Sequence, residues 1–290
     1  MSAPRPLWLA VAPAIFLVLW SGGFSVAKIG LQYAEPITFL ALRYVCVVAI
    51  LAPLYLIFRP PMPNGPRAWA DVAITGFLIQ VVYFGLCYMA FKRGISAGSV
   101  AIIVCLQPIL VGLIAPRFVG EKVGLARWIG LGLGLAGAVM VIASRSTIGV
   151  SDALGVAAAV VALFGITGGT LYEKRFGVSH HPITTNLIQY GVGVGLTVPL
   201  ALATESLHID WTWAFGATVA YLVIGNSLTS MTLLLAMIRS GEVARVSSLF
   251  YLVTPLAALI AWPLLGEAMP LWAWAGMAMA ATGVAIANRR

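Results

Sequence analysis

Ten apolar segments dominate the chain, and each is long enough to cross a lipid bilayer as a helix, which takes about 20 residues. The connections between them are short and leave no room for a soluble domain. Apolar residues make up 61% of the 290 residues and charged residues only 9%, too few to cover the surface of a soluble protein. We therefore predict an all-α membrane protein with ten transmembrane helices, at Leu7–Gly30, Pro36–Phe58, Trp69–Phe91, Gly98–Phe118, Leu125–Ser144, Asp152–Glu173, Ile183–Thr204, Trp213–Ile238, Val243–Leu265 and Leu271–Asn288.

The basic residues are distributed unevenly over the two sides of this predicted protein. With ten spans both termini lie on one side, and that side carries 12 of the 17 lysines and arginines, against 4 on the other. Loops rich in lysine and arginine stay in the cytoplasm, so we expect cytoplasmic N and C termini. Membrane topology thus explains the net charge of +8, which does not indicate a nucleic-acid partner.

The second half of the sequence repeats the first. The aligned positions, at an offset of 146 or 147, include Gly22-Gly23 with Gly168-Gly169, Pro108 with Pro255, and Gly120-Glu121 with Gly266-Glu267. Five spans per half is an odd number, so the second half enters the membrane upside down relative to the first. We predict two inverted five-helix repeats, over residues 1–148 and 149–290, an arrangement found in many secondary transporters.

Several stretches resemble a known family. "LWSGGFSVAK" and "EPITFLALRY" in the first half, with "ITGGTLYEKR" and "GEAMPLWAWAGMAMAATGVAIA" in the second, are similar to the EamA repeat of the drug/metabolite transporter superfamily. The resemblance covers nearly the whole chain, and the YddG-like exporters are similar members. It implies a multi-pass protein of the bacterial inner membrane that exports aromatic and other amino acids and related metabolites by alternating access.

Polar residues in the middle of the spans come in repeat-related pairs, which places both members of a pair at the same depth. Such residues are costly against lipid and tend to face a cavity or another helix. Inverted-repeat transporters bind substrate near the midplane, so we expect a cavity between the halves; interhelical hydrogen bonding alone is the alternative. The predicted lining consists of Trp20, Ser21, Gln80, Tyr83, Tyr88, Gln107, Thr167, Asn226, Ser227, Ser230, Tyr251 and Thr254.

Two prolines and one arginine stand out within the spans. Pro108 and Pro255 lack a backbone donor and are predicted to kink their helices, either as hinges or only for packing. Arg43 is the one charge inside a span. It either attracts a substrate carboxylate or extends its long side chain to the membrane interface, and we favour the second. Spans five and ten carry small residues four apart, such as Gly130 and Gly134, so we expect close helix packing or a homodimer contact there.

The acidic residues are absent from the middle of the spans. All nine fall at span ends or in loops, whereas proton-coupled antiporters usually keep an ionisable group deep in the membrane. We therefore expect facilitated export that is not proton-driven. A proton-coupled drug/metabolite antiporter of the same superfamily and a non-transporting receptor or scaffold are the alternatives.

One motif is compatible with an enzyme. "GISAG", from Gly94 to Gly98, fits G-x-S-x-G with Ser96 as nucleophile. That motif requires a preceding strand and a histidine base, but here a transmembrane helix precedes it and the histidines lie in loops. We predict no enzymatic activity, and no motif or ligand spacing indicates a cofactor or a metal.

Overall fold

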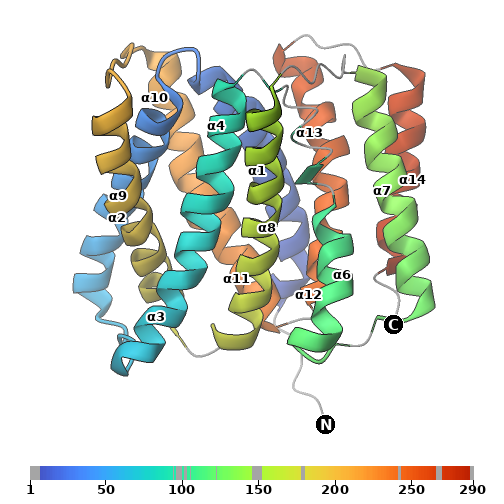
Figure 1. Ribbon diagram of the computed structural model, residues 1–290, viewed down its shortest axis with the longest axis horizontal. Coiled ribbons are helices and arrows are strands. Elements are labelled where there is room, and N and C mark those ends of the chain that lie inside the picture. Colours follow the sequence, from blue (N-terminus) through green and yellow to red (C-terminus); the bar gives the residue numbers. More distant parts are fainter. Residues whose placement is uncertain are drawn as a thin grey trace.

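The computed structural model describes residues 7–93, 95, 100, 103–104, 106–121, 123–145, 152–177, 180–240, 243–265 and 270–287. These residues form a bundle of helices, and the only strand-like feature among them is an isolated bridge between Ala34 and Ile209. The start of α1 (Leu7–Gly30) and the end of α14 (Leu271–Ala287) lie at the same end of the bundle (Figure 1). We call this the terminal end and the opposite one the distal end.

Most of the other helices follow the predicted segments, but the described part of the fourth segment is interrupted at Leu106 and the ninth segment at Leu249, which hydropathy did not indicate. In chain order they are α2 (Pro36–Phe58), α3 (Gly65–Gly76), η1 (Phe77–Gly85), α4 (Leu86–Lys92), α6 (Gln107–Phe118), α7 (Leu125–Arg145), α8 (Ala153–Phe176), α9 (Pro182–Thr204), α10 (Trp213–Ala220), η2 (Tyr221–Ser230), α11 (Met231–Ser240), α12 (Val243–Ser248) and α13 (Phe250–Leu265).

Within the described residues, six helical segments are long and apolar enough to cross a bilayer. Three shorter apolar helices accompany them, at Leu125–Met140, Val246–Ala257 and Leu271–Ala287. Many large apolar side chains point outward, as a lipid-facing surface requires. The fold is therefore that of a multi-pass helical membrane protein. The six long segments are Val11–Gly30, Pro36–Phe58, Gly65–Lys92, Ala153–Phe176, Pro182–Thr204 and Trp213–Ser240.

Two of the long segments contain a π-helical stretch. η1 joins α3 to α4, and η2 joins α10 to α11. A π-helix closes its hydrogen bonds five residues apart instead of four, which disturbs the regular ladder of the α-helix. Two tyrosines bond to carbonyls in these stretches: Tyr44 donates to the Gln80 carbonyl oxygen at 2.8 Å, and Tyr190 donates to that of Ser227 at 3.1 Å.

The two prolines proposed as hinges differ in their surroundings. Pro108 is the second residue of α6, in the first turn, where the missing N–H is not needed. A turn at Leu106 precedes α6, so the span is interrupted beside Pro108, whose role as a hinge stays a prediction. Pro255 does lie inside a helix, α13, and a turn at Leu249 separates α13 from α12.

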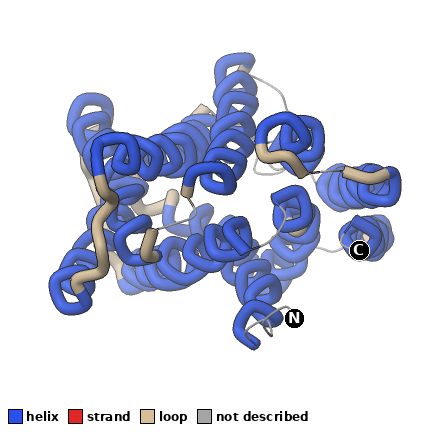
Figure 2. Tube along the Cα trace, turned by 90° about the horizontal axis from the view of Figure 1, so that it is seen from below, coloured by secondary structure: helices blue, strands red, loops and turns tan. Residues whose placement is uncertain are grey.

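The small-residue helices α7 and α14 pack chiefly against each other, at one edge of the bundle (Figure 2). A Cβ atom added at Gly137 would lie 2.6 Å from the Gly276 carbonyl oxygen, and one added at Gly130 would lie 2.6 Å from that of Gly283. Contacts this close to backbone are possible only for glycine. The close packing expected of these helices therefore occurs between α7 and α14 of the same chain.

Candidate functional site

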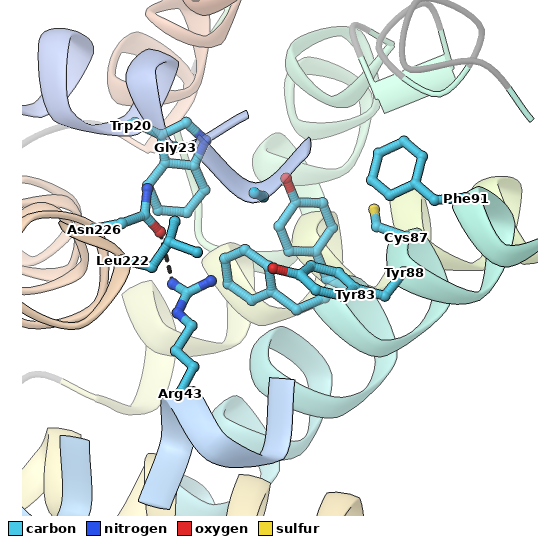
Figure 3. A pocket seen from close by; sticks show the side chains of 11 residues that line it. Trp20, Gly23, Arg43, Tyr83, Cys87, Tyr88, Phe91, Leu222 and Asn226 are labelled. Carbon is cyan, nitrogen blue, oxygen red and sulfur yellow. Dashed lines mark hydrogen bonds between the residues drawn. The ribbon is translucent and has the colours of Figure 1, made fainter. Parts of the chain in front are cut away.

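A cavity lies between helices of the two halves of the chain, nearer the distal end. Arg43 marks its depth, because it lies seven residues into α2, roughly 10 Å from the distal start of that helix at 1.5 Å per residue. The cavity has a volume of about 50 Å³, enough for roughly three or four water molecules. It is lined by Trp20, Gly23, Ala27, Arg43, Tyr83, Phe84, Cys87, Tyr88, Phe91, Leu222 and Asn226 (Figure 3).

Aromatic rings form most of the wall. The ring centroids of Trp20 and Phe84 are 5.9 Å apart, and those of Tyr83 and Phe84 are 4.7 Å apart. In α4, the ring centroids of Tyr88 and Phe91 are 6.4 Å apart. Such rings bury large flat surfaces and suit an apolar or aromatic ligand.

Arg43 places a positive charge in this aromatic cavity. Its side chain is only 2% exposed, so the prediction that it extends to the membrane interface is wrong. Nε donates a hydrogen bond to the Ser227 hydroxyl at 2.7 Å, and Nη2 donates to Asn226 Oδ1 at 2.6 Å. The guanidinium also lies 4.9 Å from the centroid of the Phe84 ring, a cation–π contact. These contacts link α2 to η2 and hold the charge against the cavity.

The structure brings some of the predicted lining residues together. Trp20, Tyr83, Tyr88 and Asn226 line the cavity. Ser227 lies behind it, as the hydrogen-bond partner of Arg43.

Gln80 does not reach the cavity, although its spacing from Tyr83 and Cys87 predicted one shared face. The spacing assumed an α-helix, but Gln80 and Tyr83 lie in η1, where the wider π turn changes which side chains align. The Gln80 side chain is fully buried, and its Cβ lies near Gly193 of α9. Its amide has no hydrogen-bond partner among the described residues.

Other predicted polar residues contact helices and not the cavity. Gln107 Nε2 lies 3.2 Å from the Ser247 hydroxyl and 3.4 Å from that of Thr170, so it bridges helices. Thr167 donates to the Leu163 carbonyl in its own helix, and Ser230 lies 3.4 Å from the Phe16 carbonyl. Gln107 and Ser230 thus make the interhelical contacts of the alternative reading, whereas Thr167 bonds within α8.

The remaining predicted residues also lie away from the cavity lining. Ser21 is buried in α1, and its hydroxyl has no hydrogen-bond partner in the described structure. Tyr251 packs in a separate cluster with Leu131, Ala138 and Val284. Thr254 belongs to α13, but its side chain is outside the described residues.

Seven lining residues were not predicted as such: Gly23, Ala27, Arg43, Phe84, Cys87, Phe91 and Leu222. Arg43 did carry a signal, since it is the one charge inside a predicted span. Phe84 and Phe91 carried none, because an aromatic residue in an apolar helix looks the same whether it faces lipid, core or cavity.

Ion pairs lie toward both ends of the bundle, on either side of the cavity. At the distal end, Lys92 lies 3.3 Å from Glu205, which also accepts hydrogen bonds from the N-terminus of α2. At the terminal end, Arg239 Nε lies 2.6 Å from the fully buried Glu173, and Arg239 also donates to Thr185 of α9. The two cations are 147 positions apart, which is the offset of the sequence repeat.

A bundle of apolar helices around a partly open, largely aromatic cavity that carries a charge is typical of a polytopic membrane transporter. Comparison with known proteins agrees. The model of the EamA-like transporter family matches the chain twice, at residues 6–143 and 153–289. The chain belongs to the EamA-like transporter family, within the drug/metabolite transporter superfamily, and the predicted resemblance is confirmed.

Three curated relatives with transporter or exporter names align with this chain over most of their length. The uncharacterized transporter YvbV of Bacillus subtilis is 25% identical, across 97% of this chain and 92% of its own. The uncharacterized inner membrane transporter YedA of Escherichia coli is 23% identical, across 89% and 83%. A probable terminal-alkyne amino-acid exporter of Streptantibioticus cattleyicolor is 24% identical, across 100% and 95%.

A solved crystal structure has the same fold. It superposes with a TM-score of 0.81 and covers 97% of both chains at 18% sequence identity. The family and the names of the relatives describe transporters and not enzymes. The candidate nucleophile Ser96 lies outside the described residues.

Proposed function

We propose that this protein exports small organic solutes, chiefly amino acids with aromatic or other apolar side chains, through its central cavity. The cavity carries the proposal, because it combines flat apolar walls with one buried charge and draws its lining from both halves of the chain. A relative named as a probable amino-acid exporter supports the same substrate class.

The proposed architecture is ten transmembrane helices in two inverted repeats, over residues 1–148 and 149–290. Two separate matches to the family model support it. So do the two tyrosine contacts, because Tyr44 and Tyr190 are 146 positions apart and each donates to a carbonyl in a π-helical stretch. The ring centroids of these two tyrosines are 5.4 Å apart. This contact is compatible with a pseudo-two-fold axis passing between them.

Transport by alternating access requires the two ends to open in turn. A cavity of about 50 Å³ is too small for a free amino acid, so the helices must move before substrate enters. The Lys92–Glu205 pair and the Arg239–Glu173 pair stand where such openings would break contacts between helices. We propose that they close the distal and terminal ends respectively, and that α13, which contains Pro255, bends as a hinge.

The transport is proposed to be facilitated by the substrate gradient alone. None of the residues that line the described cavity is acidic, which argues against a proton site there. A proton-coupled antiporter is the second candidate, because Glu173 is a fully buried acid in the terminal-end ion pair. Protonation of its carboxylate would break that pair.

The proposed location is a bacterial inner membrane, with the terminal end in the cytoplasm. The basic residues of the loops support this orientation, and a relative is an inner membrane transporter. A homodimer through α7 and α14 is also proposed. It would use their outward faces, such as those of Leu125 and Ile129, since the small-residue faces are occupied within the chain.

Flux into vesicles that contain only the purified protein tests the function. Labelled phenylalanine should enter with saturable kinetics without a pH gradient. Flux that occurs only with the gradient would replace the facilitated mechanism with proton coupling. No flux of any amino acid would refute the proposed function.

A cavity variant ties the flux to the site. Tyr83→Ala removes a lining ring and should lower the flux severalfold. Tyr55→Ala makes the same change on α2 away from the cavity and should leave the flux unchanged. Equal flux in both variants would mean that the substrate passes elsewhere.

A further inference from the structure

Arg43 is a buried cation without an anionic partner. Its contacts are to Asn226, Ser227 and the Phe84 ring, and the hydroxyls of Tyr88 and Tyr190 lie beside it. The ion pairs between described residues involve other cations, and the ionisable side chains found around this guanidinium are those of Tyr44, Tyr88 and Tyr190. A buried charge without a counter-charge is costly, and the cost is recovered when an anion binds beside it.

The guanidinium also has hydrogen-bond donors to spare. It carries five N–H groups in a planar fork. Its bonds to Ser227 and Asn226 occupy one N–H each, and the hydroxyls of Tyr88 and Tyr190 can take at most two more. Figure 3 shows the group reaching from α2 toward the space between Asn226 and the tyrosines. Such a fork is suited to a carboxylate, which accepts two parallel N–H···O bonds.

We infer that Arg43 recognises the carboxylate of the substrate and that the substrate's ammonium group is not required for binding. This inference rests on the proposed function and deepens it. The site takes monocarboxylates with an apolar or aromatic body, whether or not they carry an amine. Amines that lack a carboxylate are rejected, because their positive charge would lie beside Arg43 with no acid among the lining residues to offset it.

Three compounds with one phenyl ring separate the two charges of an amino acid. L-phenylalanine has both, 3-phenylpropionate lacks the ammonium, and 2-phenylethylamine lacks the carboxylate. Calorimetric titration of the purified full-length protein should give dissociation constants within about tenfold for the first two, and roughly 10- to 100-fold weaker binding for the amine. An amine that binds as tightly as phenylalanine overturns the inference, as does a failure of phenylpropionate to bind.

An isosteric variant tests Arg43 without removing it. Asn226→Asp keeps an oxygen next to Nη2 and supplies the missing counter-charge from within the protein. Carboxylate binding should fall at least tenfold, while the melting temperature stays at or above that of the original protein. Asn64→Asp adds the same charge at the exposed start of α3 and should not change binding. Unchanged carboxylate binding in Asn226→Asp refutes the role of Arg43.

A second substitution covers the possibility that Asn226→Asp does not fold. Arg43→Lys keeps the charge but loses the planar fork. It should weaken phenylpropionate binding several-fold and retain the preference over phenylethylamine. Loss of that preference, with binding of phenylpropionate unchanged, contradicts the inference.

Binding and flux fail in different ways, so this inference can be separated from the proposed function. If phenylalanine does not cross vesicles but binds with the predicted preference, transport is refuted and the carboxylate site stands. If phenylalanine and phenylethylamine cross equally well, transport stands and the carboxylate site is refuted.

Discussion

Substitution of Gly137 by alanine should destabilise the protein by forcing α7 and α14 apart. The added Cβ would lie 2.6 Å from the Gly276 carbonyl oxygen, whereas real Cβ atoms essentially never approach another atom within 3.0 Å. The atoms it meets belong to the backbone of α14, so no side chain can rotate away. The two helices must therefore separate by roughly half an ångström, and neighbouring close contacts, including that of Gly130, loosen with them.

The change in unfolding free energy follows from two opposing effects. Overpacking of a tight interface costs about 1–3 kcal/mol, whereas exchanging glycine for alanine inside a helix gains at most about 1 kcal/mol. Gly132 lies on the same helix with open space around it, so Gly132→Ala receives only the gain. The two variants should thus differ in unfolding free energy by about 1–3 kcal/mol, or roughly 2–10 °C in melting temperature.

Thermal denaturation of the two variants in the same detergent measures this difference. Gly137→Ala should melt below the original protein, and Gly132→Ala at or above it. Binding of 3-phenylpropionate should be the same in both, because no residue of α7 or α14 lines the cavity. If Gly137→Ala melts as high as Gly132→Ala, the backbone contact between α7 and α14 does not exist as described.

Three further outcomes follow from the contacts in the bundle. Tyr44→Phe and Tyr190→Phe each remove one hydroxyl bond to a π-helical carbonyl, so each should cost about 0.5–1.5 kcal/mol in thermal denaturation; a cost in only one of them would contradict equivalent roles. Glu173→Gln breaks the buried pair and should cost on the order of 3 kcal/mol, yet facilitated flux should persist; its loss would favour the proton-coupled candidate. Hydrogen bonds from the Ser206 side chain and backbone lower the pKa of Glu35 below its usual 4.5. This contact therefore stabilises the distal loops above pH 4.5 and is lost as the pH falls through the lowered value. Ser206→Ala should raise the pKa of Glu35 in a carboxyl NMR titration, and an unchanged value would refute the contact.

The helices could be predicted well from hydropathy because a bilayer imposes its own length on them. A spanning segment must satisfy its backbone internally over about 20 residues. For that reason Pro36–Phe58 ends where the predicted segment ends. Local breaks were not predictable in the same way. The π-helical stretches and the start of α6 at Gln107 depend on how neighbouring helices pair backbone groups, and hydropathy averages over these details.

The candidate site was predicted only in part. Trp20, Tyr83, Tyr88 and Asn226 line the cavity, and substrate binding by them stays a prediction. Gln80 does not reach the cavity, because it lies in a π-helical stretch with a wider turn than the assumed α-helix. Arg43 was recognised as unusual, but its surroundings were predicted wrongly.

The sequence alone is sufficient to predict the transporter family and the location in a membrane. Both follow from sequence patterns. Apolar length and a repeated motif are local features, which do not depend on which helices become neighbours. The surroundings of Arg43 are different, because its partners Asn226 and Ser227 lie 183 and 184 positions away along the chain. Only the packing of α2 against η2 decides that this charge is buried beside an aromatic cavity. A long basic side chain can otherwise reach the water interface at far lower cost.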